Sequence, residues 1–121
     1  MSSTAKPSPQ GLLPLSPMGI HLLLSLCEGE RHGYALKREI VRRTGGALNP
    51  GPGVLYGSIN RLVEQGLIEE SDERPDPHLD DERRRYYRIT PFGVRVARAE
   101  TERMRQLVRL ADVALALPGP A

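Results

Sequence analysis

The sequence predicts a mainly α fold with one small β-hairpin, an α+β class in which a long helix ends the chain. Three features of the sequence support this class. Apolar residues recur at helical spacing in three short segments between residues 16 and 65. Two segments with strand character follow, at residues 67–71 and 84–89. A heptad pattern then runs through residues 91–117.

Size and composition indicate a single domain. The chain has 121 residues, of which 39% are hydrophobic and 26% charged, and a formal net charge of +2. A core rarely divides below about 250 residues. Lys6 and Lys37 are the only lysines, so the basic surface consists of arginine, which suits forked contacts with phosphate and guanine. No apolar run reaches the roughly 18 residues of a membrane span and no secretory leader is recognisable, so we expect a cytoplasmic protein without a membrane partner.

The first helix is expected after a loose tail of residues 1–15, which are rich in Ser, Pro and Gly. Ser16 and Pro17 form a helix-start signal, and Gly29 ends the apolar run. This run is apolar around most of its circumference, so we place the helix at the centre of the core. Cys27 lies within it and is the only cysteine, which excludes an internal disulfide. A small buried thiol is the expected role, and a redox-sensing thiol is the alternative.

The second helix is predicted over residues 33–43. We expect Gly33 to allow a tight entry and Tyr34 to anchor the helix in the core, with no catalytic or sensory role for His32. Its apolar stripe consists of Tyr34, Leu36, Ile40 and Val41.

The third helix is predicted from Pro52 to Gln65, with Gly66 as its stop. Its apolar residues recur at helical spacing and should be buried: Leu55, Ile59, Leu62 and Val63. The opposite face contains Val54, Gly57, Ser58, Arg61 and Gln65.

A hairpin follows, with a long charged loop over residues 72–83. Strand alternation places Arg85, Tyr87 and Ile89 on one face of the second strand. The opposite face of that strand carries Arg84, Tyr86 and Arg88. The loop tip is acidic, so we expect it to swing away from phosphate or to pair with nearby arginines; its acidic residues are Asp76, Asp80, Asp81 and Glu82.

The last helix is predicted over residues 91–117, with residues 118–121 as a tail. Thr90 and Pro91 repeat the helix-start signal. A heptad seam would leave an apolar stripe exposed on a monomer, so we predict a homodimer held by this helix. The seam consists of Ala97, Thr101, Met104, Val108, Ala111 and Leu115.

The second and third helices, joined by a glycine-containing turn, have the helix-turn-helix arrangement, and the hairpin after them is placed as a wing. We therefore expect a winged helix-turn-helix domain over residues 16–90. In such a domain the second helix of the motif enters the major groove of double-stranded DNA.

Several motifs in order resemble the PadR family of transcriptional regulators. They are His32-Gly33-Tyr34, Pro52-Gly53-Val54-Leu55-Tyr56, the segment from Arg61 to Ile68, and the segment from Arg84 to Thr90. The resemblance extends over roughly residues 12 to 105. It implies a dimeric winged-helix repressor of the smaller subclass, which has a single C-terminal dimerisation helix. It also implies a small hydrophobic or phenolic effector.

The third helix supplies most of the candidate DNA-binding residues. The N–H groups around Gly53 and Val54 can bind phosphate, and the small residues Gly57 and Ser58 allow a close approach. Asn60 could pair with adenine and Arg61 could reach guanine or the backbone. The alternative for Arg61 is a solvated surface arginine.

Tyr56 and the wing complete this candidate surface. The resemblance suggests a phosphate contact for the Tyr56 hydroxyl, and the alternative is a packed ring with a hydrated hydroxyl. The wing cations Arg83, Arg84 and Arg85 lie near phosphate or minor-groove reach, although alternation sends Arg84 and Arg85 to opposite sides.

Other functional classes are less well supported by the sequence. No nucleophile, acid–base pair or metal cluster is recognisable, so we expect neither an enzyme nor a cofactor or metal site. A winged-helix interaction module that does not bind DNA is the alternative, and the acidic loop tip favours it. The aromatic content of 4% and the absence of tryptophan argue against an aromatic-lined effector pocket. A pocket between residues 12–24 and the last helix is the remaining expectation.

Overall fold

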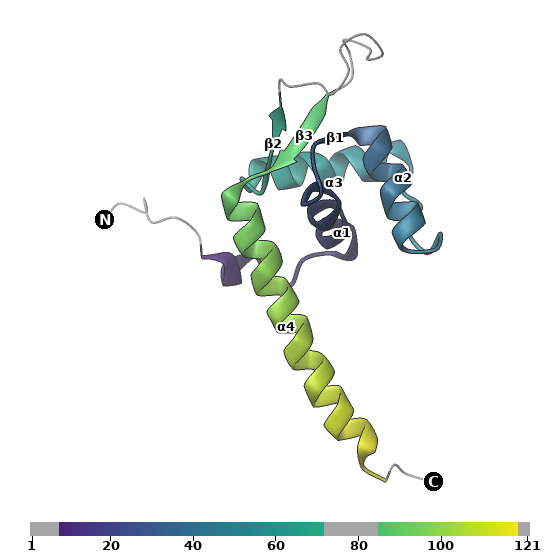
Figure 1. Ribbon diagram of the computed structural model, residues 1–121, viewed down its shortest axis with the longest axis vertical. Coiled ribbons are helices and arrows are strands. Elements are labelled where there is room, and N and C mark those ends of the chain that lie inside the picture. The colour runs from purple at the N-terminus through teal and green to yellow at the C-terminus, as the bar shows by residue number, and fades with distance from the viewer. Residues whose placement is uncertain (1–7, 72–84, 119–121) are drawn as a thin grey trace, which may run out of the picture.

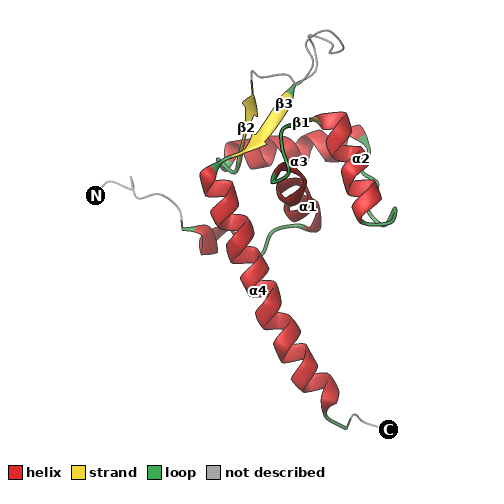
Figure 2. Ribbon diagram, viewed as in Figure 1, coloured by secondary structure: helices red, strands yellow, loops and turns green. Residues whose placement is uncertain are grey.

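The computed structural model describes residues 8–71 and 85–118. Three helices and a small sheet form the body, and a long fourth helix leaves the sheet and projects past this body (Figures 1 and 2). The predicted mainly α class with a small β element is confirmed. In chain order the elements are η1 (Pro9–Leu12), α1 (Pro17–Leu26), β1 (Arg31–His32), α2 (Gly33–Arg43), α3 (Pro52–Glu64), β2 (Ile68–Ser71), β3 (Tyr86–Ile89) and α4 (Pro91–Ala116).

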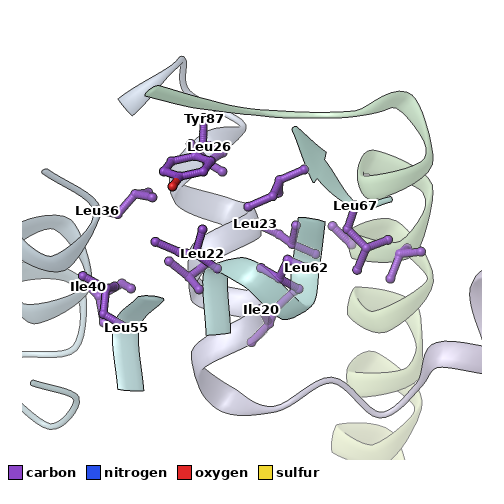
Figure 3. Close-up of a cluster of buried hydrophobic side chains, with 14 residues drawn as sticks. Ile20, Leu22, Leu23, Leu26, Leu36, Ile40, Leu55, Leu62, Leu67 and Tyr87 are labelled. Carbon is purple, nitrogen blue, oxygen red and sulfur yellow. The ribbon is translucent and has the colours of Figure 1, made fainter. Parts of the chain in front are cut away.

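Helix α1 lies at the centre of the core, as predicted. The Ser16 hydroxyl caps it by accepting a hydrogen bond from the Gly19 N–H at 2.9 Å. Its side chains Leu22 and Leu23 are completely buried. Figure 3 shows them between the Leu36 and Ile40 side chains of α2 and Leu67, which precedes β2.

Cys27 is exposed, so the expected burial of its thiol is wrong. It follows Leu26, the last residue of α1, and lines a groove between the end of α1 and α4. The chain leaves the helix at this point, so the apolar run no longer determines which side chains are covered.

Two apolar residues expected in the core are also exposed. Tyr34 is 60% exposed, and the Arg38 guanidinium lies 5.3 Å from the centre of its ring. Tyr34 lies about 200° around α2 from the buried Leu36, so it cannot share the buried side of the helix. Val63 of α3 is 37% exposed. The other residues predicted for the buried face of this helix are buried and lie together on one side: Leu55, Ile59 and Leu62.

The sheet contains a strand that the sequence did not predict. Its order is β1-β3-β2, and both pairs are antiparallel. Strand β1, expected as a break, pairs His32 with Tyr86. Tyr86 and Tyr87 are therefore both buried despite their alternation. The Tyr86 ring meets the His32 ring edge-on at 5.4 Å, and Tyr87 joins the core.

The turn from β3 into α4 is closely packed. The Thr90 hydroxyl accepts a hydrogen bond from the Gly93 N–H at 3.0 Å and donates one to the Gly66 carbonyl oxygen at 2.6 Å. A Cβ atom on Gly93 would lie 2.0 Å from the Leu67 carbonyl oxygen. A side chain at Gly93 would therefore force α4 away from the sheet.

Residues 8–15 are packed on the body, in contrast to the expected loose tail. Helix η1 contacts α4, and the Leu15 N–H donates to the Glu100 carboxylate at 2.8 Å. Glu100 is completely buried and also pairs with Arg103. The Arg103 hydrogen bond, together with that from Leu15, lowers the pKa of Glu100. A buried carboxylate thus connects the N-terminal segment to α4.

Candidate DNA-binding surface

The predicted reading face of α3 is open to solvent. Gly53, Val54 and Gly57 are exposed along the first two turns. The first hydrogen bond of the helix is donated by the Leu55 N–H to the Gly51 carbonyl oxygen at 3.0 Å. The N–H groups of Gly53 and Val54 precede it, so they point out of the helix end. This front can approach a flat or grooved partner without obstruction by large side chains.

One flank of α3 faces α2 and β3. Tyr56 and Asn60 line a hollow of about 380 Å³, which we call the tyrosine hollow. Arg85, placed just before β3, also lines it. The structure thus brings these three predicted residues together. The full lining is His32, Gly33, Tyr34, Tyr56, Asn60, Arg85 and Tyr87.

Gly33 sets the position of the Tyr56 ring. A Cβ atom at Gly33 would lie 2.5 Å from the Tyr56 hydroxyl oxygen and 2.7 Å from a ring carbon. The absence of a side chain there lets the ring lie against the start of α2, while Tyr56 stays 43% exposed. The ring is therefore packed as the alternative interpretation expected, and the residue is still accessible.

The other flank of α3 faces the N-terminal segment. Ser58 and Arg61 border a second hollow of about 270 Å³, whose other wall includes Leu12, Pro14 and Ser16. Ser58 is half-buried and Arg61 is exposed. The predicted reading face is consequently divided into a bare front and two polar flanks. The involvement of the N-terminal segment was missed, because residues 1–15 were expected to be a tail.

The charges beside this surface are partly neutralised. Arg85 pairs with Glu70 at 3.3 Å and Arg88 pairs with Glu69 at 3.0 Å. On α2, Glu39 pairs with Arg42 and Arg43. The hydrogen bond from Arg42, followed by that from Arg43, lowers the pKa of Glu39 from 4.5 to about 2.

The two remaining wing candidates, Arg83 and Arg84, lie outside the described residues, as does the acidic loop tip. Their roles stay predictions. Arg85 is the predicted wing cation that the structure places, 71% of its side chain being exposed.

The predicted dimer seam on α4 is divided between the core and the surface. Ala97 is 5% exposed and belongs to the core of its own chain. Thr101 is half-buried and donates a hydrogen bond to the Ala97 carbonyl oxygen at 2.9 Å. Farther along, Met104, Val108 and Leu115 are 36%, 57% and 84% exposed, and Ala111 is half-buried. An exposed apolar seam therefore begins at Met104.

Comparison with known proteins decides the family. Residues 22–99 match the transcriptional regulator PadR-like family. The chain belongs to the PadR-like family. The resemblance found in the sequence motifs is confirmed, and with it the class of transcriptional regulators.

Solved structures agree with this assignment. A transcriptional regulator from Clostridium thermocellum is 25% identical, with a TM-score of 0.65 over 93% of this chain and 95% of that one. RosR of H. salinarum is 28% identical, with a TM-score of 0.62 over 88% of this chain and 99% of that one. A PadR-like transcriptional regulator from Bacillus cereus, 18% identical with a TM-score of 0.67 over 90% of this chain and 96% of that one, shares the fold.

One curated relative is much longer than this chain. A 37.1 kDa protein of transposon TN4556 from Streptomyces fradiae is 33% identical over 86 residues. The match spans 71% of this chain and 22% of that protein. Within the described part of the chain, no helix has the length and apolar character needed to cross a membrane. In the same residues, His, Cys, Asp and Glu nowhere gather in threes that could hold a metal ion.

Proposed function

We propose that this PadR-like protein is a sequence-specific DNA-binding repressor that binds a palindromic operator as a homodimer. The observation that carries the proposal is the bare front of α3, formed by Gly53, Val54 and Gly57. A helix reads bases from the major groove with its N-terminal residues nearest the base edges. Small residues at that end allow the backbone of the helix to lie deep in the groove.

The polar residues beside this front would then contact bases and the strands that border the groove. Arg61 follows Gly57 by one turn and can donate two hydrogen bonds to guanine or one to the backbone, and Asn60 beside the tyrosine hollow can pair with adenine. Arg85 adds a cation beside Asn60. Contacts to bases would supply the specificity, and contacts to phosphates would supply the register.

Dimerisation is the second part of the proposal and rests on α4. Its exposed apolar side chains cover roughly two thirds of the circumference of the helix after Met104. This arc is far wider than the seam of a two-stranded coiled coil, so α4 would need more than one neighbouring helix from a partner. In addition to the seam, the arc contains Leu107, Leu110, Val113 and Leu117, which are between 55% and 68% exposed.

A small hydrophobic or phenolic effector is the third part. The groove between the end of α1 and α4 has a volume of about 650 Å³ and is lined by Leu24, Cys27 and Ile89 together with residues of α4. It adjoins the proposed dimer seam at Thr101. A ligand bound there could change the separation of the two α3 helices. It would do so by binding one state of the dimer more tightly than the other. Such a regulator would act in the cytoplasm.

The test is a salt titration of binding to a labelled random duplex, followed by fluorescence anisotropy. A DNA-binding protein loses affinity steeply as salt rises, because it releases counterions from phosphates. Undetectable binding even at low salt would instead support the winged-helix interaction module. The pairing of Arg85 and Arg88 with Glu70 and Glu69 is the observation that favours this second candidate.

A further inference from the structure

We propose that the tyrosine hollow is a seat for one backbone phosphate of the bound DNA, with Tyr34 as a binding residue alongside Tyr56, Asn60 and Arg85. This inference rests on the proposed DNA-binding function and assigns a ligand to a cavity beside α3. Tyr34 enters as a new site residue, since its sequence pattern had placed it in the core.

The chemistry of the lining favours a phosphodiester. Tyr34 and Tyr56 carry hydroxyl donors, Asn60 an amide donor and Arg85 a guanidinium, and all four line one cavity of about 380 Å³. They come from the start of α2, from α3 and from the residue before β3. A tetrahedral anion can accept hydrogen bonds from several directions at once, which suits donors that three elements supply around one cavity.

Tyr34 is held at the rim of this cavity without being buried. Its ring is 60% exposed, and Arg38, one turn later on α2, lies over it at 5.3 Å. This cation–π contact restricts the ring without covering it. Tyr34 therefore remains accessible to a ligand at the rim.

The cavity also lies where a DNA strand would pass. In a helix-turn-helix protein the first helix of the motif crosses the backbone while the second lies in the groove. The tyrosine hollow lies between these two helices, α2 and α3. Gly33, the first residue of α2, forms part of its wall, so the positive end of that helix lies beside the cavity.

The balance of charge makes the seat mostly neutral. The Arg85 guanidinium is 3.3 Å from the Glu70 carboxylate, which offsets part of its attraction for phosphate. Burial raises the pKa of Tyr87, with a further contribution from Glu70, so that hydroxyl keeps its proton. We therefore expect the hydroxyl contacts to contribute affinity for every duplex without adding to the salt dependence.

The experiment is a thermodynamic cycle between protein and DNA. Each backbone phosphate of an operator obtained by selection is replaced in turn by a neutral methylphosphonate, and binding is measured for the wild-type protein and for the double variant Tyr34→Phe/Tyr56→Phe. We expect one position at which the replacement weakens wild-type binding about tenfold and leaves the double variant nearly unchanged. The double variant should lose affinity for operator and for random duplex by the same factor. The dependence of its affinity on salt concentration should be unaltered.

Tyr86→Phe is the matched control, because the Tyr86 ring packs on His32 and is not part of the cavity lining. It should retain the full sensitivity to the methylphosphonate. If methylphosphonate replacement weakened binding equally in wild type and double variant at every phosphate, the proposed phosphate seat would be wrong and DNA binding would still stand. Failure of the wild-type protein to bind any duplex would remove the proposed function and the seat together.

Discussion

The body of the protein and the second half of α4 bury their apolar side chains in different ways. In the body, the central helix α1 is enclosed by α2, α3 and α4 of the same chain, and Leu22 and Leu23 are completely buried. The C-terminal half of α4 projects from the body (Figure 1), and its large apolar side chains are exposed from Met104 onward, Leu115 by 84%. The body therefore has its core within one chain, whereas the exposed apolar end of α4 is the part that the proposed dimer would cover.

This contrast predicts that a charge on α4 separates two protomers without unfolding either of them. Val108→Asp would bury an unpaired carboxylate in each half of the proposed interface, at a cost of about 3–5 kcal/mol for each copy. We expect the dimer to weaken by at least on the order of a thousandfold. Operator affinity should fall with it, since a single reading helix makes too few contacts.

Sedimentation velocity at micromolar concentration and circular dichroism are the measurements. Arg109→Asp, at the neighbouring exposed position, is the control for added negative charge and should remain dimeric. A wild-type protein that sediments as a monomer would contradict the second half of the comparison.

In the body, a cavity should destabilise the chain itself. Leu23→Ala removes a completely buried side chain and should lower the free energy of unfolding by about 2–5 kcal/mol. Leu115→Ala should change the unfolding of the separated protomer by less than about 0.5 kcal/mol. Urea unfolding in the Val108→Asp background measures both, and similar losses for the two variants would show that α4 is stabilised within its own chain.

A smaller effect is expected at the reading surface. Arg61→Ala should weaken operator binding by about 1–3 kcal/mol and relax the choice of base at one position if the guanidinium contacts guanine. Arg85→Ala should weaken all duplexes to a similar extent, because the proposed contact of Arg85 is with a backbone phosphate and not with a base. Competition between operator and random duplex distinguishes these outcomes. Unchanged affinity together with unchanged selectivity of the Arg61 variant would mean that Arg61 is a solvated surface arginine and that the reading face is misassigned.

The smallest effect concerns pH and the ion pairs of α2. The pKa of Glu39 is about 2 in the folded chain, against an ordinary value of 4.5. A lowered folded pKa contributes stability that is present above about pH 4.5 and is lost as the pH falls toward 2. Unfolding in urea at pH 5 and pH 3 should show this loss, and Glu39→Gln should reduce the difference between the two pH values. An identical pH dependence in the variant would mean that Glu100 or another carboxylate accounts for it.

Local patterns in the sequence predicted the fold well. Ser16 and Thr90 cap α1 and α4 as expected, and Leu55, Ile59 and Leu62 form the buried side of α3. These features depend on residues a few positions apart, so a single segment contains the information. The front of α3 was predicted for the same reason, since small residues at helical spacing identify it.

The remainder depends on contacts between distant segments. Strand β1 has two residues and exists because His32 pairs with Tyr86. The N-terminal segment is held because Glu100, buried on α4, accepts the Leu15 N–H. The tyrosine hollow unites residues from three elements. None of these partners is adjacent in the sequence, so periodicity could not predict them. The exposure of Tyr34, by contrast, follows from its position about 200° around α2 from Leu36, which helical geometry could have predicted.

The most direct test of DNA reading by a pair of α3 helices is selection of bound sequences from a random duplex pool. We predict enrichment of two inverted half-sites whose centres are about one helical turn apart, roughly 10–10.5 base pairs or a multiple of this. Sequences with no enriched motif, or a single half-site without an inverted copy, would contradict the account.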